Sequence, residues 1–420
     1  MTLQRRELGR TGMKVSQLCL GSMTWGSQND QREANGQIER ALEFGVNFID
    51  TAEMYPTTPM SADTLGGTET LIGNWFAASG RRDEVVLATK VTGSGPAWMF
   101  GGHDISAARM RSAVEGSLKR LRTDRIDLYQ LHWPNRGSYH FRQHWGFDAA
   151  GQSTAAMHDH VDEVLDAASD LVREGKIRAL GLSNESAWGT MQFLKAAERH
   201  SDLPRVATVQ NEYNLLCRLF DTDMAELSHH EDVGLLAFSP LAAGMLSGKY
   251  ADGAVPDGSR RAQNAALGGR WTPRAIAATD AYVALAREHG LDPSVMALAF
   301  CLGRPFMASV IIGATTMAQL ETCLGAADPV LSDELLQAID EREGTHLSAA
   351  ADAPGSDVVG LDAGVLAGGG ASGTRLSDAL LADAALAGPR PRARPGSLVE
   401  VMSDRAVPVP DAPAAPDTVN

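Results

Sequence analysis

The chain has 420 residues, enough for one barrel of about 250 residues with insertions or for two or three smaller domains. It carries 37 lysines and arginines against 52 aspartates and glutamates, and a formal net charge of −15 argues against a general nucleic-acid or anionic-membrane surface. No stretch approaches the ~18 uninterrupted apolar residues of a membrane span, and MTLQRRELGR has no apolar signal-peptide core. We therefore expect a cytoplasmic protein with neither a membrane nor a nucleic-acid partner.

The first predicted elements are two short strands in residues 5–16, on either side of the turn pair Thr11-Gly12. Such a hairpin could plug the base of a barrel. Residues 17–21, QLCLG, follow as the first barrel strand. A helix then begins at Asn29 or Asp30, both good N-cap types. One face of this helix carries four apolar side chains: Ala34, Ile38, Ala41 and Leu42.

Strands and helices then alternate along the chain. The apolar run 46–49 ends in Asp50, and a helix is predicted near 67–78. Two further helices are recognised by apolar spacing: Met110, Val114, Leu118 and Leu121 in one, and Val161, Val164, Leu165, Ala168, Leu171 and Val172 in the other. A long polar loop precedes the second of them. The remaining strands are predicted in 85–90, 126–132, 177–184, 206–211, 234–240 and 309–314.

Eight strand–helix units predict an α/β protein with a closed (β/α)8 TIM barrel over residues 1–345. The rival is a doubly wound dinucleotide-binding fold, which needs GxGxxG directly after an early strand. The first strand instead leads into Gly21 to Gly26 with the wrong spacing. One GxGxxG does occur, at Gly368, Gly370 and Gly373, but no βαβ pattern follows it, so we interpret it as accidental.

Residues 346–420 differ in composition, because Ala, Gly, Pro and Asp dominate there. A segment with so little large apolar surface cannot offset its ordering entropy, so we expect a disordered tail. Within it, residues 377–386 could form one short helix, with Leu376, Leu380 and Leu381 on one face and Gly388 after its end.

Four cysteines lie far apart in sequence without a CxxC pair, and we expect reduced thiols that pack as small apolar side chains: Cys19, Cys217, Cys301 and Cys323. The long polar loop contains His140, His144, His158 and His160 at irregular spacing. We interpret these as residues of a solvated loop rather than metal ligands, and we expect no metal.

Candidate catalytic groups stand at or just beyond three predicted strand ends. Asp50 ends one strand, with Tyr55 five residues later, and Lys90 and His132 end two others. A phenol is a poor acid unless a neighbouring cation stabilises the phenolate, and a carboxylate can hold that cation in place. Taken singly, each residue has an ordinary structural role in most proteins. Together, at strand ends that meet on one face of a barrel, they indicate an active site.

The motifs FIDTAEMY, VVLATK and LHWP occur here in the order typical of the aldo-keto reductases, and residues 3–343 resemble that family. The resemblance is greatest to its Tas-like and potassium-channel β-subunit branches. It implies an oxidoreductase that uses NADPH to reduce aldehydes or ketones, with a small-molecule carbonyl substrate. It also implies that Asp50, Tyr55, Lys90 and His132, hereafter the tetrad, are the catalytic residues. In that mechanism Tyr55 protonates the forming alkoxide, Lys90 lowers the pKa of Tyr55, Asp50 orients Lys90, and His132 aligns the carbonyl.

The resemblance also implies which residues bind NADP(H). Amide and hydroxyl groups would hold the nicotinamide carboxamide, an aromatic ring would stack on the nicotinamide, a loop would run beneath the pyrophosphate, and two cations would supply positive charge. These residues are Ser22, Met23, Gln28, Ser183, Asn184, Gln210, Phe238, Ser239, Pro240, Leu241, Ala242, Ala243, Lys249, Arg260, Gly313, Thr315 and Gln319. The chain departs from many members at three adenosine-end positions, where it carries Ala314, Gln319 and Cys323.

Aromatic residues of the long loop are expected to shape an apolar substrate pocket together with Trp25: Trp133, Tyr139, Phe141 and Trp145. The alternative function is a redox-sensing interaction module with little turnover, like the channel β-subunits. Those relatives often carry Asn at the position of His132, so the complete tetrad favours an enzyme.

Overall fold

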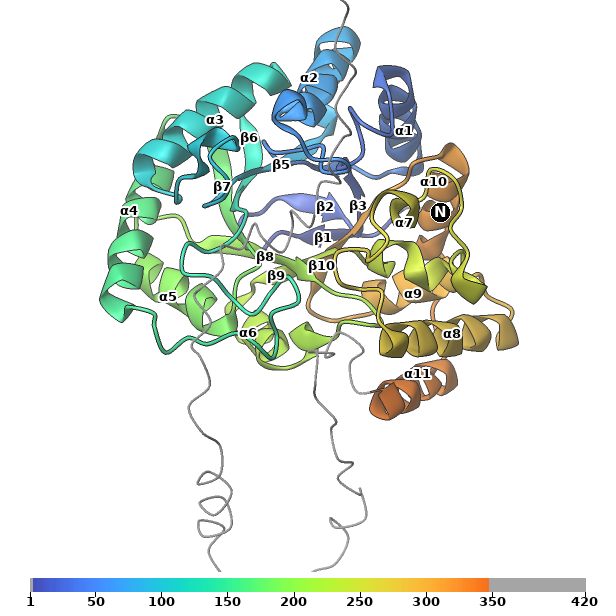
Figure 1. Cartoon of the computed structure of the whole chain (residues 1–420). Coiled ribbons are helices and arrows are strands. Elements are labelled where there is room, and N and C mark those ends of the chain that lie inside the picture. The colour runs from blue at the N-terminus through green and yellow to red at the C-terminus, as the bar shows by residue number, and fades with distance from the viewer. Residues whose placement is uncertain (1–2, 347–420) are drawn as a thin grey trace, which may run out of the picture.

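The computed structural model describes residues 3–346, so the predicted tail with its short helix and the GxGxxG match lie outside the described part. Eight parallel strands close into a barrel in chain order, with β10 returning to pair with β3 (Figure 1). The strands are β3 (Leu18–Gly21), β4 (Phe48–Asp50), β5 (Val86–Val91), β6 (Ile126–Leu131), β7 (Ile177–Ser183), β8 (Val206–Glu212), β9 (Gly234–Phe238) and β10 (Met307–Ile312). The predicted (β/α)8 barrel is confirmed.

Helices surround the strands, as expected when both faces of a parallel sheet are buried (Figure 1). They are α1 (Gln31–Phe44), α2 (Gly67–Ser79), α3 (Ala107–Leu121), α4 (Thr154–Arg173), α5 (Ala187–Glu198), α6 (Asp223–Glu231), α7 (Arg260–Gln263), α8 (Pro273–Glu288), α9 (Pro293–Leu302), α10 (Met317–Leu324) and α11 (Asp333–His346). The last helix packs outside the ring, against α8. None of the helices described is both long enough and apolar enough to cross a membrane.

Local signals explain where the helices start and stop. Helix α1 begins at the N-cap Asp30, whose carboxylate accepts from the N–H of Glu33 while the Glu33 side chain accepts from the N–H of Asp30. This reciprocal capping box satisfies two helix-end donors. The helix ends at Gly45, whose φ of 101° is readily adopted by glycine. The predicted start of this helix at Asp30 is confirmed.

The N-terminal hairpin, β1 (Arg5–Glu7) and β2 (Lys14–Ser16), is antiparallel and closes the base of the barrel, as predicted (Figure 1). Leu8, Met13 and Val15 pack in one cluster with at least one side chain from every barrel strand. The strand members are Cys19, Phe48, Ala88, Leu128, Ala179, Ala207, Leu236, Ala308 and Ile311. The lower half of the barrel interior is therefore an apolar core and not a pore.

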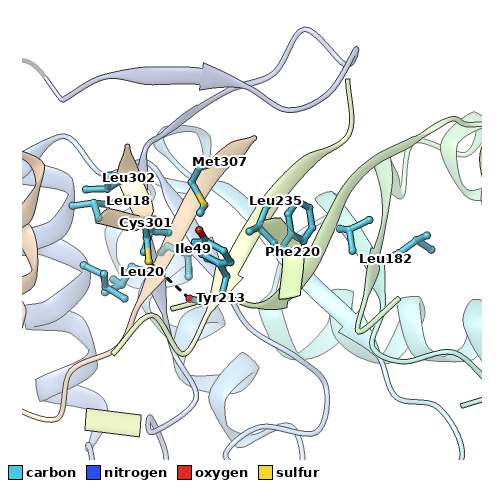
Figure 2. Packing of buried hydrophobic residues seen from close by; sticks show 14 of the residues in the cluster. Leu18, Leu20, Ile49, Leu182, Tyr213, Phe220, Leu235, Cys301, Leu302 and Met307 are labelled. Atoms are coloured by element: carbon cyan, nitrogen blue, oxygen red, sulfur yellow. Dashed lines mark hydrogen bonds between the residues drawn. The ribbon is translucent and has the colours of Figure 1, made fainter. Parts of the chain in front are cut away.

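The larger core lies between the barrel wall and the helices. Successive side chains of a strand point to opposite faces, so Leu18 and Leu20 face the helices while Cys19 between them faces the barrel interior. Figure 2 shows this outer layer, where the Cys301 thiol lies 3.9 Å from the carbonyl oxygen of Tyr213. All four cysteines are free and buried, as predicted.

Two predictions about surface and core were wrong. Val172 was assigned to the apolar face of its helix, but it is 38% exposed near the end of α4. The loop of residues 132–153 after β6 was expected to be solvated, yet its first part is held against the barrel mouth and buries Trp133, Ser138 and His140. Residues 148–151 are exposed as expected, and His158 and His160, which were assigned to the loop, lie on α4. Spacing alone did not show that this loop has ion-pair and hydrogen-bond partners on neighbouring strands.

Candidate functional site

The apolar cluster in the lower barrel interior, hereafter the plug, is followed by a second, polar layer, because successive side chains of a strand alternate between the two faces. Asp50, Lys90 and Gln130 each stand two residues after a plug residue of the same strand, so they face the same interior at the carboxyl end. Parallel pairing sets Lys90 beside Gln130, and Asp50 beside Ala88. Three neighbouring strands thus place a carboxylate, an ammonium group and an amide inside one ring.

Asp50 and Lys90 form a buried ion pair, with 2.6 Å between Lys90 Nζ and Asp50 Oδ2. Lys90 Nζ also donates to the carbonyl oxygen of Thr51 at 2.8 Å, and Lys90 is completely buried. Burial by itself would lower the pKa of Lys90, but the charge of Asp50, its hydrogen bond and the neighbouring Tyr55 together more than offset it, so that pKa is raised. Lys90 is therefore a cation at neutral pH.

Two amides complete the setting of Asp50. Gln210 Nε2 donates to Asp50 Oδ1 at 2.8 Å, and Gln130 Nε2 donates to the same oxygen at 3.2 Å. Gln130 was not predicted as a site residue, although its alternation with Leu128 and His132 in IDLYQLH was a usable signal. Space for it comes from Gly181, where a Cβ would lie 3.1 Å from Gln130 Cγ.

Tyr55 lies beside this pair, with Lys90 Nζ 5.0 Å from the centroid of its ring. Burial raises the pKa of the Tyr55 phenol, while the charge of Lys90 and a hydrogen bond with it act in the opposite direction. The net pKa lies above the ordinary value. Lys90 does act in the predicted direction, but burial outweighs it. The phenol is therefore protonated at neutral pH and able to give up a proton.

His132 is the fourth member of the tetrad and follows β6 directly. Its ring lies 6.0 Å from that of Tyr55 between centroids, and its carbonyl oxygen accepts from Asn184 Nδ2 at 2.9 Å. Burial and the charge of Lys90 hold the pKa of His132 well below its usual range, so the imidazole is neutral at pH 7. A neutral imidazole carries one N–H donor and one acceptor nitrogen.

The predicted carboxamide-binding residues lie next to the tetrad. Asn184 has a left-handed φ of 54° after β7, and its Oδ1 is buried without a partner among the described residues. Ser183 Oγ donates to the carbonyl oxygen of Gln210 at 2.9 Å. The Gln210 amide donates to Asp50 Oδ1 and to Gln130 Oε1, so its amide hydrogens are engaged inside the barrel. An unpartnered buried amide oxygen, such as Asn184 Oδ1, fits a ligand that donates a hydrogen bond.

The loop after β9 has an unusual backbone. Phe238 ends the strand, Ser239 has φ 51°, and Ala242, Ala243 and Gly244 follow with φ 48°, 57° and 92°. Non-glycine residues in this region cost of order 1–3 kcal/mol each, and such strain clusters at ligand-binding segments. Pro240 and Leu241 lie inside the same turn, which the Asn214 side chain holds by donating to the carbonyl oxygen of Ser239 at 2.9 Å.

Two cations lie beside this loop without a carboxylate within ion-pair distance in residues 3–346: Lys249 and Arg260. A Cβ on Gly244 would lie 2.8 Å from Lys249 Nζ, so the ammonium group lies over the loop backbone. Burial and the charge of Arg260 lower the pKa of Lys249, and burial and the charge of Arg270 lower that of Arg260 to about 10. Two crowded, uncompensated cations favour an anion between them.

The remaining predicted positions form the rim of the same face. Ser22 Oγ donates to the carbonyl oxygen of Asp50 at 2.7 Å, and Gln28 Nε2 donates to that of Gly258, two residues before Arg260, at 2.9 Å. The Met23 carbonyl oxygen accepts from the Thr57 N–H at 3.4 Å. Gly313 follows β10 and is exposed, and Gln319 Oε1 accepts from the Thr315 N–H at 2.9 Å.

The predicted substrate-pocket residues do not all lie together. Trp25 is fully buried and its indole donates to Gln37 Oε1 at 3.0 Å, so its assignment to the pocket was wrong. Trp145 is 68% exposed. Trp133 and Phe141 pack instead in an apolar cluster that also includes Tyr55. Tyr139 stacks near His140 in the same loop, with 4.5 Å between ring centroids.

Glu212, at the end of β8, is a further charged residue that was not predicted. It pairs with Arg142 and Arg270, and although burial would raise the pKa of Glu212, the two arginines lower it to about 2. No group of three or more His, Cys, Asp or Glu side chains in residues 3–346 has the arrangement of a metal site.

A family model described as the aldo/keto reductase family matches residues 17–343. The chain belongs to the aldo/keto reductase family. The match to the family extends over the whole barrel, and the chain is accordingly an oxidoreductase of a family that uses nicotinamide cofactors.

Relatives agree with the predicted branch of the family. The Escherichia coli (strain K12) protein tas is 42% identical over 344 residues, covering 80% of this chain and 97% of the relative. The uncharacterized oxidoreductase YrpG of Bacillus subtilis (strain 168) is 34% identical over 341 residues, or 80% of this chain and 94% of the relative. A probable voltage-gated potassium channel subunit beta of Arabidopsis thaliana is 30% identical over 359 residues, or 81% and 98%.

The residues of the site fit a nicotinamide dinucleotide of the kind that this family uses. Asn184 Oδ1 offers an unpartnered acceptor beside the tetrad, and Lys249 and Arg260 offer uncompensated positive charge beside the strained loop. The acceptor suits a carboxamide, and the cations suit phosphate groups.

Proposed function

We propose that this chain is an NADP(H)-dependent oxidoreductase that reduces aldehydes or ketones to alcohols, with Tyr55 as the general acid. The observation that carries the proposal is the position of Lys90. It is a fully buried cation that is paired with Asp50 at 2.6 Å and lies 5.0 Å from the centre of the Tyr55 ring. A buried ammonium group beside a phenol serves chemistry in which the phenol loses its proton.

The roles of the side chains follow from their electrostatics. The nicotinamide, when bound, supplies the hydride. Tyr55 is protonated at neutral pH, since burial raises its pKa above an ordinary value that is already well above 7, so its O–H is available to an oxygen that gains negative charge. Lys90 then stabilises the phenolate left behind on Tyr55. Neutral His132 donates to the substrate carbonyl oxygen and aligns it. Donors held in place before the charge develops stabilise the transition state without reorganisation.

Two features of the site support a phosphorylated cofactor and an apolar substrate. Lys249 and Arg260 have no carboxylate partner among the described residues, and the cofactor with the additional phosphate offers them more charge. The cluster of Met54, Met99 and Trp133 beside Tyr55 favours an apolar carbonyl compound as the substrate. We also propose that the enzyme works in the cytoplasm.

A second candidate is an NADPH-binding module that reports redox state to a partner. It is favoured by the likeness to proteins named as probable voltage-gated potassium channel β-subunits. The complete tetrad favours turnover over sensing alone. Aldehyde reduction by the purified chain supports the enzyme, and a stable complex without turnover supports the module.

The test is NADPH oxidation by purified protein across aldehydes, ketones and quinones, followed by Tyr55→Phe. Loss of the phenol should lower kcat by about 10² to 10⁴, the contribution of a general acid, while NADPH affinity changes little. Tyr282→Phe is the matched control, because it removes a tyrosine hydroxyl on α8 outside the site. Unchanged turnover in Tyr55→Phe would sink the proposed mechanism.

A further inference from the structure

The loop of residues 132–153 carries two strained residues where it crosses the barrel mouth. Phe141 has φ 56° and Arg142 has φ 70°, so two consecutive non-glycine residues are left-handed. Such a backbone persists only where surrounding contacts hold it, and it is most common at functional sites. Contacts with other segments of the chain therefore hold Phe141 and Arg142 in this conformation.

Arg142 is held by a buried carboxylate on a barrel strand. Its Nη2 lies 2.5 Å from Glu212 Oε2, and the Glu212 side chain is 8% exposed. Arg270, from the segment before α8, binds the same carboxylate from a second direction, at 3.0 Å through Nε and 3.1 Å through Nη2. We call these three residues the Glu212 clamp. It joins the loop after β6, the end of β8 and the loop that carries Arg260.

Phe141 directs its ring into the apolar cluster beside the tetrad. The ring meets Trp133 edge-on, with 6.3 Å between centroids and an interplanar angle of 87°. Trp133 in turn lies 4.9 Å from the ring of His132. Tyr55, Met60 and Phe100 pack on the same cluster and are partly exposed, as is Phe141. These side chains form an apolar wall beside Tyr55, and Phe141 is part of it.

Arg142 and Phe141 make separate contacts. Arg142 pairs with Glu212, while the ring of Phe141 packs on the apolar cluster beside Tyr55. Arg270 keeps Glu212 paired if Arg142 is replaced, so no bare buried carboxylate results. The clamp can consequently be weakened at Arg142 without removing the only partner of Glu212.

We propose that the Glu212 clamp positions Phe141 as one wall of the substrate pocket, and that this wall makes the enzyme prefer bulky apolar carbonyl compounds over small ones. The inference rests on the proposed function and adds to it a preference for bulky over small substrates and three positioning residues. None of the three is required to touch the reacting atoms. Their effect reaches the substrate through the placement of Phe141.

The experiment compares 2-naphthaldehyde with propanal, with NADPH as cofactor, in the wild type, Arg142→Met and Phe141→Ala. In both variants KM for 2-naphthaldehyde should rise about tenfold or more, the scale of lost contacts in an apolar pocket. In Arg142→Met the kcat values, KM for propanal and NADPH affinity should change less than about twofold, because lost binding of the apolar group alone raises KM. Arg142→Lys keeps a charge for Glu212 and should recover part of the selectivity.

A matched control is Arg82→Met at the other end of the barrel. Arg82 is 13% exposed and pairs with buried Asp127 at 2.8 Å, against 15% exposure for Arg142. It should lower stability and leave the ratio of the two KM values unchanged. If the wild type is active and both Arg142→Met and Phe141→Ala keep its selectivity, the clamp proposal alone is overturned. Wild type inactive with every carbonyl compound tested would overturn the proposed function and this inference together.

Discussion

Lys90 shows how a charge is kept inside this protein. Taking an ion out of water costs several kcal/mol, and the cost is recovered only where its hydrogen-bonding capacity is met. Asp50 and the Thr51 carbonyl oxygen meet it at 2.6 and 2.8 Å, and the amides of Gln130 and Gln210 hold Asp50 in turn. The same contacts that make burial tolerable also fix the ammonium group beside Tyr55.

Buried histidines give the fold a dependence on pH. Burial lowers the pKa of His132, His140, His144 and His160, and that of His140 falls to about 4. In the unfolded chain these groups titrate near 6.5. Below that pH the unfolded state binds protons that the native state does not, so the free energy of unfolding decreases as pH falls.

We therefore predict that the free energy of unfolding falls between pH 6.5 and about 4, and that His140→Gln makes this fall less steep. One such histidine contributes about 1.4 kcal/mol per pH unit while only the unfolded state is protonated. Glutamine retains a donor for the Glu185 carbonyl oxygen, which lies 3.3 Å from His140 Nε2. Urea unfolding at pH 7.5, 6 and 5 measures the slopes, and parallel curves for wild type and variant would contradict the prediction.

The alternation of side chains along each strand separates the residues of the apolar plug from those of the tetrad. One strand offers Phe48 to the apolar plug and Asp50 to the tetrad, and another offers Ala88 and Lys90. Because the period is two residues, a slip of one position would turn both layers outward. The hairpin seals the end of the barrel opposite the tetrad, so the polar layer opens only at the carboxyl end of the strands.

The loop after β9 combines backbone strain with positive charge. Its strained turn at Ala242–Gly244 stands beside Lys249, and the following segment brings Arg260 back toward the same place. Gln28, from the far end of the sequence, ties this segment down at Gly258. An anionic ligand would relieve the repulsion between the two cations.

We predict that replacing both Lys249 and Arg260 by alanine weakens NADPH more than NADH, by about ten- to a hundredfold for each charge-assisted hydrogen bond lost. Fluorescence titration with each cofactor measures the two dissociation constants. Arg261→Ala is the control, because Arg261 donates to the carbonyl oxygens of Gly253 and Ala254 and should affect both cofactors alike through the loop. If the double variant weakens the binding of NADPH and NADH equally, other residues must recognise the additional phosphate.

The whole molecule is a barrel in which every strand serves both core and site. Closure through β10 and β3 brings residues from both ends of the described chain together, as where Asn29 Nδ2 donates to the Thr315 carbonyl oxygen at 2.9 Å. All eight strands and every predicted site residue lie between residues 3 and 346. The last described helix, α11, runs to His346, two residues beyond Gly344.

We predict that a chain ending at His346 keeps the melting temperature, kcat, KM and NADPH affinity of the full chain. Residues 347–420 are rich in Ala, Gly and Pro and contribute none of the predicted catalytic or cofactor-binding groups. Side-by-side thermal melts and steady-state kinetics of the two proteins provide the check. A clear change in KM or in cofactor affinity would show that the removed segment acts at the barrel mouth.

The alternation of strands and helices could be predicted from the sequence alone. Eight apolar runs separated by helical spacing predict the barrel, and the residues that end the runs, such as Lys90 and His132, predict the tetrad. These features are local, because the period of a strand and the polarity of its last residue can be read within a few positions. The hairpin and the start of α1 were predictable for the same reason.

Contacts between distant segments could be found only from the fold. Glu212 meets Arg142 and Arg270 across separations of 70 and 58 residues, and no spacing rule relates those positions. For the same reason the sequence did not reveal that part of the loop after β6 is buried, or that Trp25 lies outside the pocket. The balance of charges at Tyr55 also needed the fold, because the pKa of a phenol depends on how much water burial removes as well as on its charged neighbour.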